Sequence, residues 1–466
     1  MSSGTSSDKS SVQELNQATI DLLRDMIRNA CVNDLTADSG AEVRNADTLE
    51  EFFADEIAAG TVTVERFEPH PGRVSIAFTV EGTDPDAEPL TLLGHTDVVP
   101  VDKPKWTQDP FGAEIVDGKI YGRGATDMLF ITAAMAAATR EVAAIAATEK
   151  TKPSDGNVRP RGTLTFVGLA DEEARGGLGA GWLAQHKPDA FSWKNCLSET
   201  GGSHLSVSDG SDALIVVVGE KGAAQRRIHV HGDAGHGSTP YGRDMTVGVI
   251  GEVARRLCAI EPEVSSSDLW EGYVRAFKFD PETEKQLING ENYEALGPLA
   301  RYSHAMSHTT YAPTVLRAGG AINVLPSHAW VELDIRPLPG QTQEEIDEVL
   351  RNALGDLADR VEIEHLITED ATISPAEGPL YEAIVDTFHE FFPDVPVIPT
   401  IAAGGSDLRF ARRLGGVGYG FALHARERLF DEVLNQLHSH DEYVEVEDVE
   451  LTAQAYYRLA RRFLGM

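Results

Sequence analysis

Short apolar runs with strand-like spacing alternate along the chain with longer runs of helical spacing. Apolar positions at helical spacing predict an opening helix over residues 12–29 and an Ala- and Met-rich helix over residues 131–147. Alternating or continuous apolar runs predict strands over residues 74–80, 89–93 and 162–169. Strand, helix and strand in this order predict a βαβ unit. The fold class is therefore α/β, with a mainly parallel sheet flanked by helices.

A second region is expected after an apolar strand at residues 213–218. It holds predicted strands at residues 227–230 and 329–335 and a predicted helix at residues 245–257. We interpret residues 219–336 as a smaller α+β domain inserted into a larger domain made of residues 12–218 and 337–466. The larger domain then continues through further predicted elements: helices at 344–357, 380–391 and 446–464, and a strand at 361–366. Residues 1–11 are expected to be a flexible tail, and residues 150–161 a surface loop.

The charge of the chain narrows the function classes. Of 466 residues, 74 are acidic and 40 are basic, which gives a formal net charge of −34. Nucleic acids and anionic membranes would be repelled by such a surface, so neither is an expected partner. Only 11 of the basic residues are Lys against 29 Arg. This bias suggests a halophilic surface kept hydrated in concentrated salt, with acidity for ordinary solubility as the alternative.

Cysteine usage and apolar run length bear on location and on metal chemistry. The apolar run at residues 213–218 is far shorter than the roughly 18 residues of a membrane helix, and the polar start has no secretory pattern. We therefore expect a cytoplasmic protein. The three cysteines Cys31, Cys196 and Cys258 are widely spaced, which fits a reducing compartment and argues against a thiolate metal site. Any metal would then use His and carboxylate ligands.

Several polar clusters follow predicted strands, where ligands gather in parallel sheets. His95 and Asp97 stand at i and i+2 after the strand at residues 89–93, so their side chains face the same side. A His and an Asp in a polar loop is the plainer interpretation of this pair. Asp127 lies in a Gly-rich bend before a helix, where its carboxylate could bridge two cations or simply cap the helix.

Further carboxylates and histidines stand at comparable places. Glu172 and Glu173 follow the end of the strand at residues 162–169, and in extended backbone the two side chains point apart. Glu199 precedes two glycines after another apolar stretch. His438 and His440 lie in an acidic segment that otherwise indicates a solvated surface. Each signal alone is modest.

Together and in this order, these segments resemble the dizinc amidohydrolases of peptidase family twenty. That family includes acetylornithine deacetylase, succinyl-diaminopimelate desuccinylase, aminoacylase, glutamate carboxypeptidase and several di- and tripeptidases. The resemblance runs from about residue 15 to the C-terminus. The matching segments are Gly94-His95-Thr96-Asp97, Asp117-Gly118 through Asp127-Met128, Asp171-Glu172-Glu173, Glu199-Thr200-Gly201-Gly202, Gly235-His236-Gly237, Asn323-Val324-Leu325-Pro326, Asp334-Ile335-Arg336, Gly404-Gly405-Ser406-Asp407 and His438 with Asp441-Glu442.

The resemblance implies a site with two zinc ions, for which Co²⁺ is a substitute. It makes Asp127 the bridging carboxylate, with His95 and Glu199 completing one ion and Glu173 and His438 the other. His438 is preferred over His440 because it has the family spacing to Asp441-Glu442. Such a His and carboxylate set suits zinc.

The resemblance also implies roles in catalysis. Glu172 matches the general base that takes a proton from water bridging the two ions, and Asp97 matches the partner of His95. His236, in the inserted domain, matches a residue that reaches the substrate, in several relatives from the partner subunit of a dimer. We therefore expect a homodimer.

The remaining matches concern the substrate. Arg336, Asn323 and the turn Gly404-Gly405-Ser406 match positions that hold a substrate carboxylate. An ion pair with Asp334 is the structural alternative for Arg336. The expected substrate is an N-acyl amino acid or a short peptide with a free carboxylate, and the sequence does not decide between them.

The chain departs from the family pattern in the segment that follows Asp127-Met128. Relatives usually continue Asp-Met with Lys-Gly, where this chain has Leu129-Phe130.

The competing hypothesis is a non-catalytic small-molecule-binding or interaction protein on the same fold. Metal-binding residue types at all five ligand positions, together with Glu172, favour the hydrolase.

Overall fold

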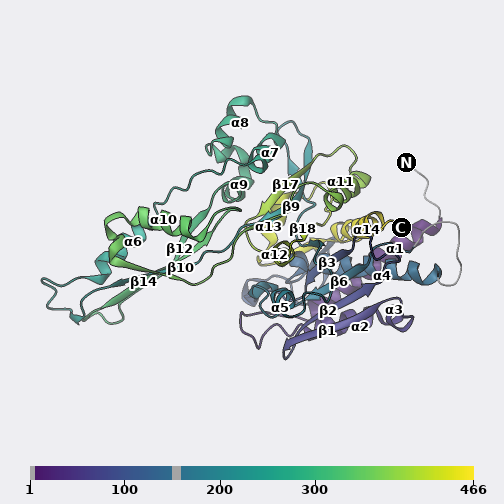
Figure 1. Cartoon of the computed structure of the whole chain (residues 1–466), viewed down its shortest axis with the longest axis horizontal. Helices are drawn as coiled ribbons and strands as arrows, with labels where there is room; N and C mark the ends of the chain where they lie inside the picture. The colour runs from purple at the N-terminus through teal and green to yellow at the C-terminus, as the bar shows by residue number, and fades with distance from the viewer. Residues whose placement is uncertain (1–5, 150–158) are drawn as a thin grey trace. The chain divides into compact units, whose positions relative to one another are not determined.

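The computed structural model describes residues 6–149 and 159–466, which form two compact units. The first unit comprises the described residues up to Val218 together with Ser374–Pro399 and Ser406–Met466, and the second comprises Gly219–Ile373 and Thr400–Gly405. Each unit is built on a β-sheet with helices packed against it (Figure 1).

The sheet of the first unit has a parallel centre. The strands lie in the order β1 (Thr63–His70), β2 (Arg73–Val80), β6 (Leu164–Leu169), β3 (Leu90–His95), β7 (Asn195–Ser198), β18 (Val417–Gly420) and β9 (Asp212–Glu220), and β8 (His204–Ser206) and β17 (Val397–Ala402) also pair with β9. The four central strands β6, β3, β7 and β18 run parallel to one another. At one edge β2 pairs antiparallel with β6 and β1 with β2, and beyond the other end of the parallel centre β9 pairs antiparallel with β18. Every residue of β3 and β6 is buried, as in strands covered on both faces.

Helices lie on both faces of this sheet. Gly94 of β3 approaches Thr132 of α4 (Phe130–Glu149), whereas Leu93, on the opposite face, shares a core cluster with α5 (Ala180–His186) and α12 (Leu408–Arg413). Helices α1 (Ser6–Arg28) and α14 (Val446–Phe463) pack against α4, and α11 (Pro379–Phe391) packs against α14. The remaining elements of this unit are α2 (Val43–Phe52), α3 (Ala54–Ala58), α13 (Phe430–Gln436), and a small sheet of β4 (Ile115–Val116), β5 (Lys119–Tyr121) and β19 (Tyr443–Glu445).

One helix of the described residues, Ala125–Ala147, is long and apolar enough to cross a membrane by length and composition alone. In this fold, 78% of its apolar window is buried inside the protein. It is the core helix that Gly94 approaches.

The second unit has a four-stranded antiparallel sheet in the order β12 (Thr310–Ala318), β14 (His328–Arg336), β10 (Arg226–His231) and β15 (Val361–His365). Helices α6 (Thr246–Leu257) and α10 (Gln343–Leu354) lie along one face (Figure 1). On that face Ile228 and Val331 of the sheet share an apolar core with Ile250 and Leu350 of the helices. The unit also contains α7 (Asp268–Ala276), α8 (Pro281–Ile288), α9 (Ala300–Ser307), β16 (Thr372–Ile373), and a short pair formed by β11 (Gly235–His236) and β13 (Val324–Leu325).

The α/β fold is as predicted, but two boundaries differ from the expected ones. The insertion was expected to end at residue 336, whereas the second unit continues to Ile373 because β15 pairs with β10 and α10 contributes to the same apolar core. Helix α1 begins at Ser6, so part of the expected tail at residues 1–11 is helical. Residues 1–5, and 150–158 of the predicted loop, lie outside the described residues.

Candidate metal centre

Five metal-ligand candidates from distant parts of the sequence meet in the first unit. His95 is the last residue of β3, Glu173 lies in the turn Glu172–Ala174 after β6, and Glu199 follows β7. Asp127 lies in the segment Ala125–Leu129 that leads into α4, at a kink where its own backbone is not helical (φ −117°, ψ 96°), and His438 follows α13. Three of the five thus stand at the carboxyl ends of neighbouring parallel strands, the expected place for a ligand site.

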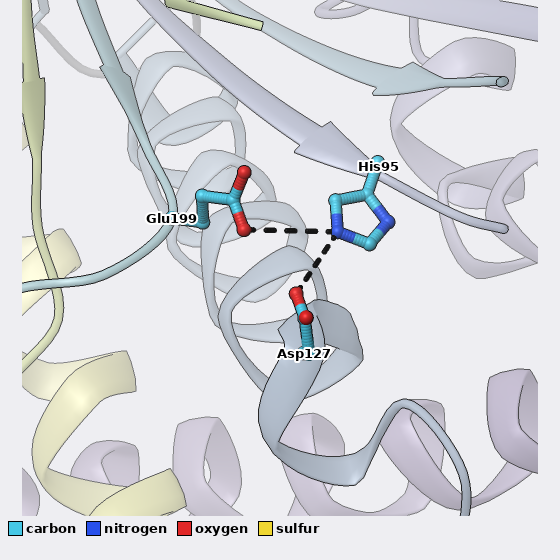
Figure 2. Close-up of side chains that lie close together, drawn as sticks. All are labelled: His95, Asp127 and Glu199. Carbon is cyan, nitrogen blue, oxygen red and sulfur yellow. Dashed lines mark hydrogen bonds and ion pairs between the residues drawn. The ribbon is translucent and has the colours of Figure 1, made fainter. Parts of the chain in front are cut away.

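The first half of the centre is formed by His95, Asp127 and Glu199 (Figure 2). His95 Nε2 lies 3.3 Å from Asp127 Oδ1 and 3.9 Å from Glu199 Oε2. The other ring nitrogen, Nδ1, lies 3.0 Å from the backbone oxygen of Asp97, and a carbonyl can only accept. Nδ1 therefore carries a proton, so in the neutral ring the lone pair of Nε2 faces two carboxylates.

The second half is formed by His438, Asp127 and Glu173. His438 Nε2 lies 3.1 Å from Asp127 Oδ2 and 3.3 Å from Glu173 Oε2. Asp127 thus turns one oxygen toward each histidine. Within each half, the potential ligand atoms all lie within 4.8 Å of one another.

Burial and crowded negative charge strongly perturb the ionisable groups. Burial, reinforced by neighbouring carboxylates, raises the pKa of Glu199 and of Glu172 well above the ordinary value. Burial opposes the charged form of His95, but the hydrogen bond to Asp127 and the charge of Glu199 outweigh it and raise its pKa. Hydrogen bonds to Asp127 and Glu173 raise the pKa of His438 to about 10. Bound cations would relieve this excess of negative charge.

The donor set fits two divalent cations. Each half supplies one imidazole nitrogen and carboxylate oxygens, the ligands that zinc and related ions accept, and Asp127 can serve both halves. The side chains of His95, Asp127, Glu173 and Glu199 are at most 14% exposed, which leaves His438 as the solvent-facing ligand at 54%. No cysteine belongs to either half.

Asp97 was expected to be the partner of His95, but its carboxylate does not make the hydrogen bond to the His95 ring. Its carboxylate lies 3.6 Å from His95 Nδ1, whereas its backbone oxygen makes the hydrogen bond to that ring. The carboxylate oxygens instead accept the backbone N–H groups of Glu172 and Glu173 at 3.2 and 3.1 Å. Asn33 donates a further bond of 2.8 Å to Asp97. Asp97 therefore links β3 to the turn that carries both glutamates.

Asp171, which precedes the turn that carries Glu172, belongs to a network of buried ion pairs. Arg73 contacts Glu42 at 2.8 Å and Asp171 at 2.5 Å, and all three side chains are at most 5% exposed. On its other side, Glu172 Oε1 lies 3.9 Å from Arg409 Nη1. These buried charges were not singled out from the sequence, because no local pattern joins Arg73 to Asp171.

Glu442 supports Asp127, although no role was assigned to it from the sequence. Its carboxylate accepts the backbone N–H groups of Gly124, Thr126 and Asp127 at 3.1, 2.8 and 3.1 Å, and pairs with Arg123 at 2.6 Å. The segment Asp441-Glu442 was the available signal, since it accompanies His438 in the family. The contact itself joins residues 319 positions apart.

The expected substrate residues lie mostly in the second unit. His236 and Asn323 come together there, because β11 pairs with β13 and Gly237 N–H donates to the Asn323 oxygen at 2.8 Å. Arg336 donates to Asp334 at 2.9 Å, so the ion pair considered as its alternative is present. Gly404 and Gly405 end the second unit, and the buried Ser406 begins the next segment of the first.

Leu129 and Phe130, which replace the Lys-Gly usual in the family, are buried in the apolar core. Both side chains are 1% exposed at the start of α4, and the Phe130 ring lies 5.7 Å from the ring of His424. Apolar packing thus occupies this position in place of the usual Lys-Gly.

Comparison with known proteins gives one family. Residues 91–462 match the family described as peptidase family M20/M25/M40. Among curated proteins, the N-fatty-acyl-amino acid synthase/hydrolase PM20D1 of Xenopus tropicalis is 28% identical over 405 residues, covering 83% of this chain and 75% of that protein. A probable carboxypeptidase S-like 2 of Dictyostelium discoideum is 25% identical over 425 residues, covering 83% and 74%.

Solved structures share the fold. An M20 family metallo-carboxypeptidase, Sso-CP2 from Sulfolobus solfataricus, superposes with a TM-score of 0.67 at 16% identity, over 97% of this chain and 100% of that one. YXEP of Bacillus subtilis, described as a dinuclear metal-binding peptidase, gives 0.57 at 14% identity, over 96% and 98%.

Proposed function

Because the chain belongs to peptidase family M20/M25/M40, it is a hydrolase of peptides or N-acyl amino acids, and we propose that the centre around Asp127 is its active site. We propose further that this centre holds two metal ions, with zinc as the natural candidate. The observation that carries the proposal is the position of Asp127, which turns one carboxylate oxygen to His95 and the other to His438. His95, Asp127 and Glu199 would hold one ion, and Asp127, Glu173 and His438 the other.

Metal ions held there would polarise the substrate carbonyl and make water a better nucleophile. Glu172 is the general base: it takes a proton from the attacking water and returns it to the leaving nitrogen. Its raised pKa, caused first by burial, suits a group that must both accept and donate a proton. Asp97 holds the backbone of Glu172 and Glu173 and so fixes where both carboxylates point.

The substrate carries a free carboxylate beside the amide that is cleaved. The names of the two relatives, an N-fatty-acyl-amino acid hydrolase and a carboxypeptidase-like protein, concern substrates that share this group. Arg336 supplies a guanidinium for it, with Asn323 and the turn of Gly404, Gly405 and Ser406 as further hydrogen-bonding groups. The Arg336 side chain remains 29% exposed beside Asp334, so solvent and a ligand can still reach it.

The chain acts as a homodimer in which His236 approaches the substrate from the partner subunit. Exposed apolar residues in β13 and near β11 and β13 in the sequence support this arrangement: Tyr241, Met245, Val247, Ile322 and Val324 are 101%, 38%, 49%, 105% and 51% exposed. Such a group of apolar side chains is typical of a surface that another protein covers.

Hydrolysis tests the proposal directly. The protein, reconstituted with Zn²⁺ or Co²⁺, is assayed on matched N-acyl amino acids, their carboxamides and dipeptides. We expect cleavage of substrates with a free carboxylate, and a loss of at least about 100-fold in kcat for Glu172→Gln. Glu114→Gln, an exposed carboxylate, serves as the control. Unchanged turnover in Glu172→Gln would remove the proposed base.

A further inference from the structure

The open face of the sheet in the second unit carries a cluster of histidines that the proposed reaction does not use. Residues of β10 alternate, so Ile228 and Val230 enter the core beneath α6 and α10. His229 and His231 therefore lie on the opposite face. His328 of β14 stands directly across from His231 in the strand pairing.

The three rings lie side by side and nearly parallel, with interplanar angles of 10–14°. Their centroids lie 4.8 Å (His231–His328), 5.1 Å (His229–His328) and 6.4 Å (His229–His231) apart. Three imidazoles on one tetrahedral ion have centroids roughly 5 Å apart, because each ligating nitrogen lies about 2.1 Å from the metal. The centroids of His328 to His229 and to His231 thus approach the spacing of a three-histidine site, whereas the His231 ring has to rotate before its nitrogen faces the other two.

Two of the rings already point ring nitrogens at each other. His229 Nδ1 lies 2.9 Å from His328 Nε2, while ligand nitrogens on a tetrahedral ion stand about 3.4 Å apart. A small rotation of either side chain opens this gap. Both histidines lie at the surface, and the His229 side chain is 16% exposed.

A carboxylate sets the tautomer of His229. Its Nε2 lies 2.9 Å from Glu364 Oε2, and an ionised carboxylate can only accept, so Nε2 carries the proton and Nδ1 keeps its lone pair. A metal-ligating histidine usually donates its second N–H to a carboxylate in this way. Arg227 holds Glu364 in place at 3.1 Å, and its charge is also paired with Glu332 at 2.6 Å.

We propose that His229, His328 and His231 form a binding site for a divalent transition-metal ion such as Zn²⁺, separate from the centre around Asp127. His229 binds through Nδ1 and His328 through Nε2, whose proton moves to Nδ1 of the same ring, so that ring stays neutral. His231 turns toward the ion as the third ligand, and water completes the coordination. Glu362, 4.0 Å from His231 Nε2, adds negative charge beside the site.

The number of bound ions tests this site without reference to activity. The full-length protein and its variants are dialysed against buffered Zn²⁺ at pH 7.5, and zinc per chain is measured by mass spectrometry. Wild type should bind one ion more than His229→Gln or His328→Gln. Because only the difference is used, the outcome does not depend on how many ions the centre around Asp127 holds.

Two further variants sharpen the result. His365→Gln is the matched control, since His365 lies in β15 of the same unit but pairs with Asp347 of α10 at 2.8 Å. It should bind as many ions as wild type, whereas Glu364→Gln should bind the additional ion about 10–100-fold more weakly. Equal zinc content in wild type, His229→Gln and His328→Gln would overturn the proposal, as would loss of the ion in His365→Gln. Circular dichroism verifies that each variant is folded.

Discussion

The carboxylate of the fully buried Glu442 accepts the backbone N–H of Asp127 at 3.1 Å, and among the described residues its other partners are Arg123 and the N–H groups of Gly124 and Thr126. We expect Glu442→Gln to destabilise the protein by about 1–3 kcal/mol, because the amide NH₂ would face N–H donors and Arg123 would lose its anion. Chemical denaturation measures this change. Metal affinity at the centre should fall about 10–100-fold, since Asp127 loses its support. Glu445→Gln, on the surface beside Lys119, should change neither quantity.

Asp97 yields a second prediction, on catalysis. Asp97→Asn keeps the size of the side chain but turns an NH₂ group toward the N–H groups of Glu172 and Glu173. We expect kcat to fall about 10–100-fold through misplacement of both glutamates. Steady-state kinetics on an N-acyl amino acid gives the value. If Asp97→Asn were as active as the exposed control Asp102→Asn, the linking role of Asp97 would be wrong.

Lys221 in the second unit makes stability depend on pH. Its side chain is 2% exposed and donates to the carbonyls of Ala305 and His308 at 2.8 and 2.7 Å and to the Thr310 hydroxyl at 3.2 Å. Burial, with a smaller effect of Arg336, lowers its pKa from 10.5 to about 7. In the unfolded chain Lys221 keeps its proton up to about pH 10.4, so between pH 7 and 10 the unfolded state binds more protons.

The contribution of Lys221 should therefore make the free energy of unfolding rise with pH between pH 7 and 10. This stabilising contribution is lost as the pH falls back through that window to the folded-state pKa of about 7. Lys221→Met removes this slope, and it costs about 2–4 kcal/mol at pH 7 because three buried oxygens lose their donor. Denaturant titrations at several pH values measure both effects. The exposed Lys285→Met is the control. An unchanged slope in Lys221→Met would show that Lys221 is not the titrating group.

The exposed apolar residues near β11 predict the oligomeric state. Ile322→Asp places a charge on the proposed dimer surface, and we expect it to convert the dimer into monomers in analytical ultracentrifugation. Leu35→Asp, an exposed apolar position in the first unit at 73%, should leave the dimer intact. A monomeric wild-type protein would remove the role of His236 in the partner's site.

Local sequence patterns were enough to predict three of the elements around the centre, the strands β3 and β6 and the helix α4, but not β7 or α13. The apolar runs of β3 and β6 identify buried parallel strands, and the carboxyl ends of such strands converge, so the sequence alone predicts that His95 and Glu173 lie near each other. The family resemblance supplied the order of the ligands and the choice of His438 over His440.

Contacts between distant residues could not be predicted in this way. Nothing in the sequence around Arg123 indicates Glu442, and the bond from Asp97 to the Glu172 turn depends on how β3 and β6 are aligned. The end of the second unit was missed for the same reason. Strand β15 joins β10 across more than a hundred residues, and apolar periodicity does not specify a partner strand.

The number of metal ions held by the centre around Asp127 tests the central claim most directly. The measurement uses the His229→Gln chain, which lacks the additional histidine site, reconstituted with Zn²⁺ and analysed by mass spectrometry. We predict two ions per chain, one ion when either His95→Gln or His438→Gln is added, and strongly reduced binding of both when Asp127→Asn is added. A single ion per chain, or two ions retained with Asp127→Asn, would contradict a centre bridged by Asp127.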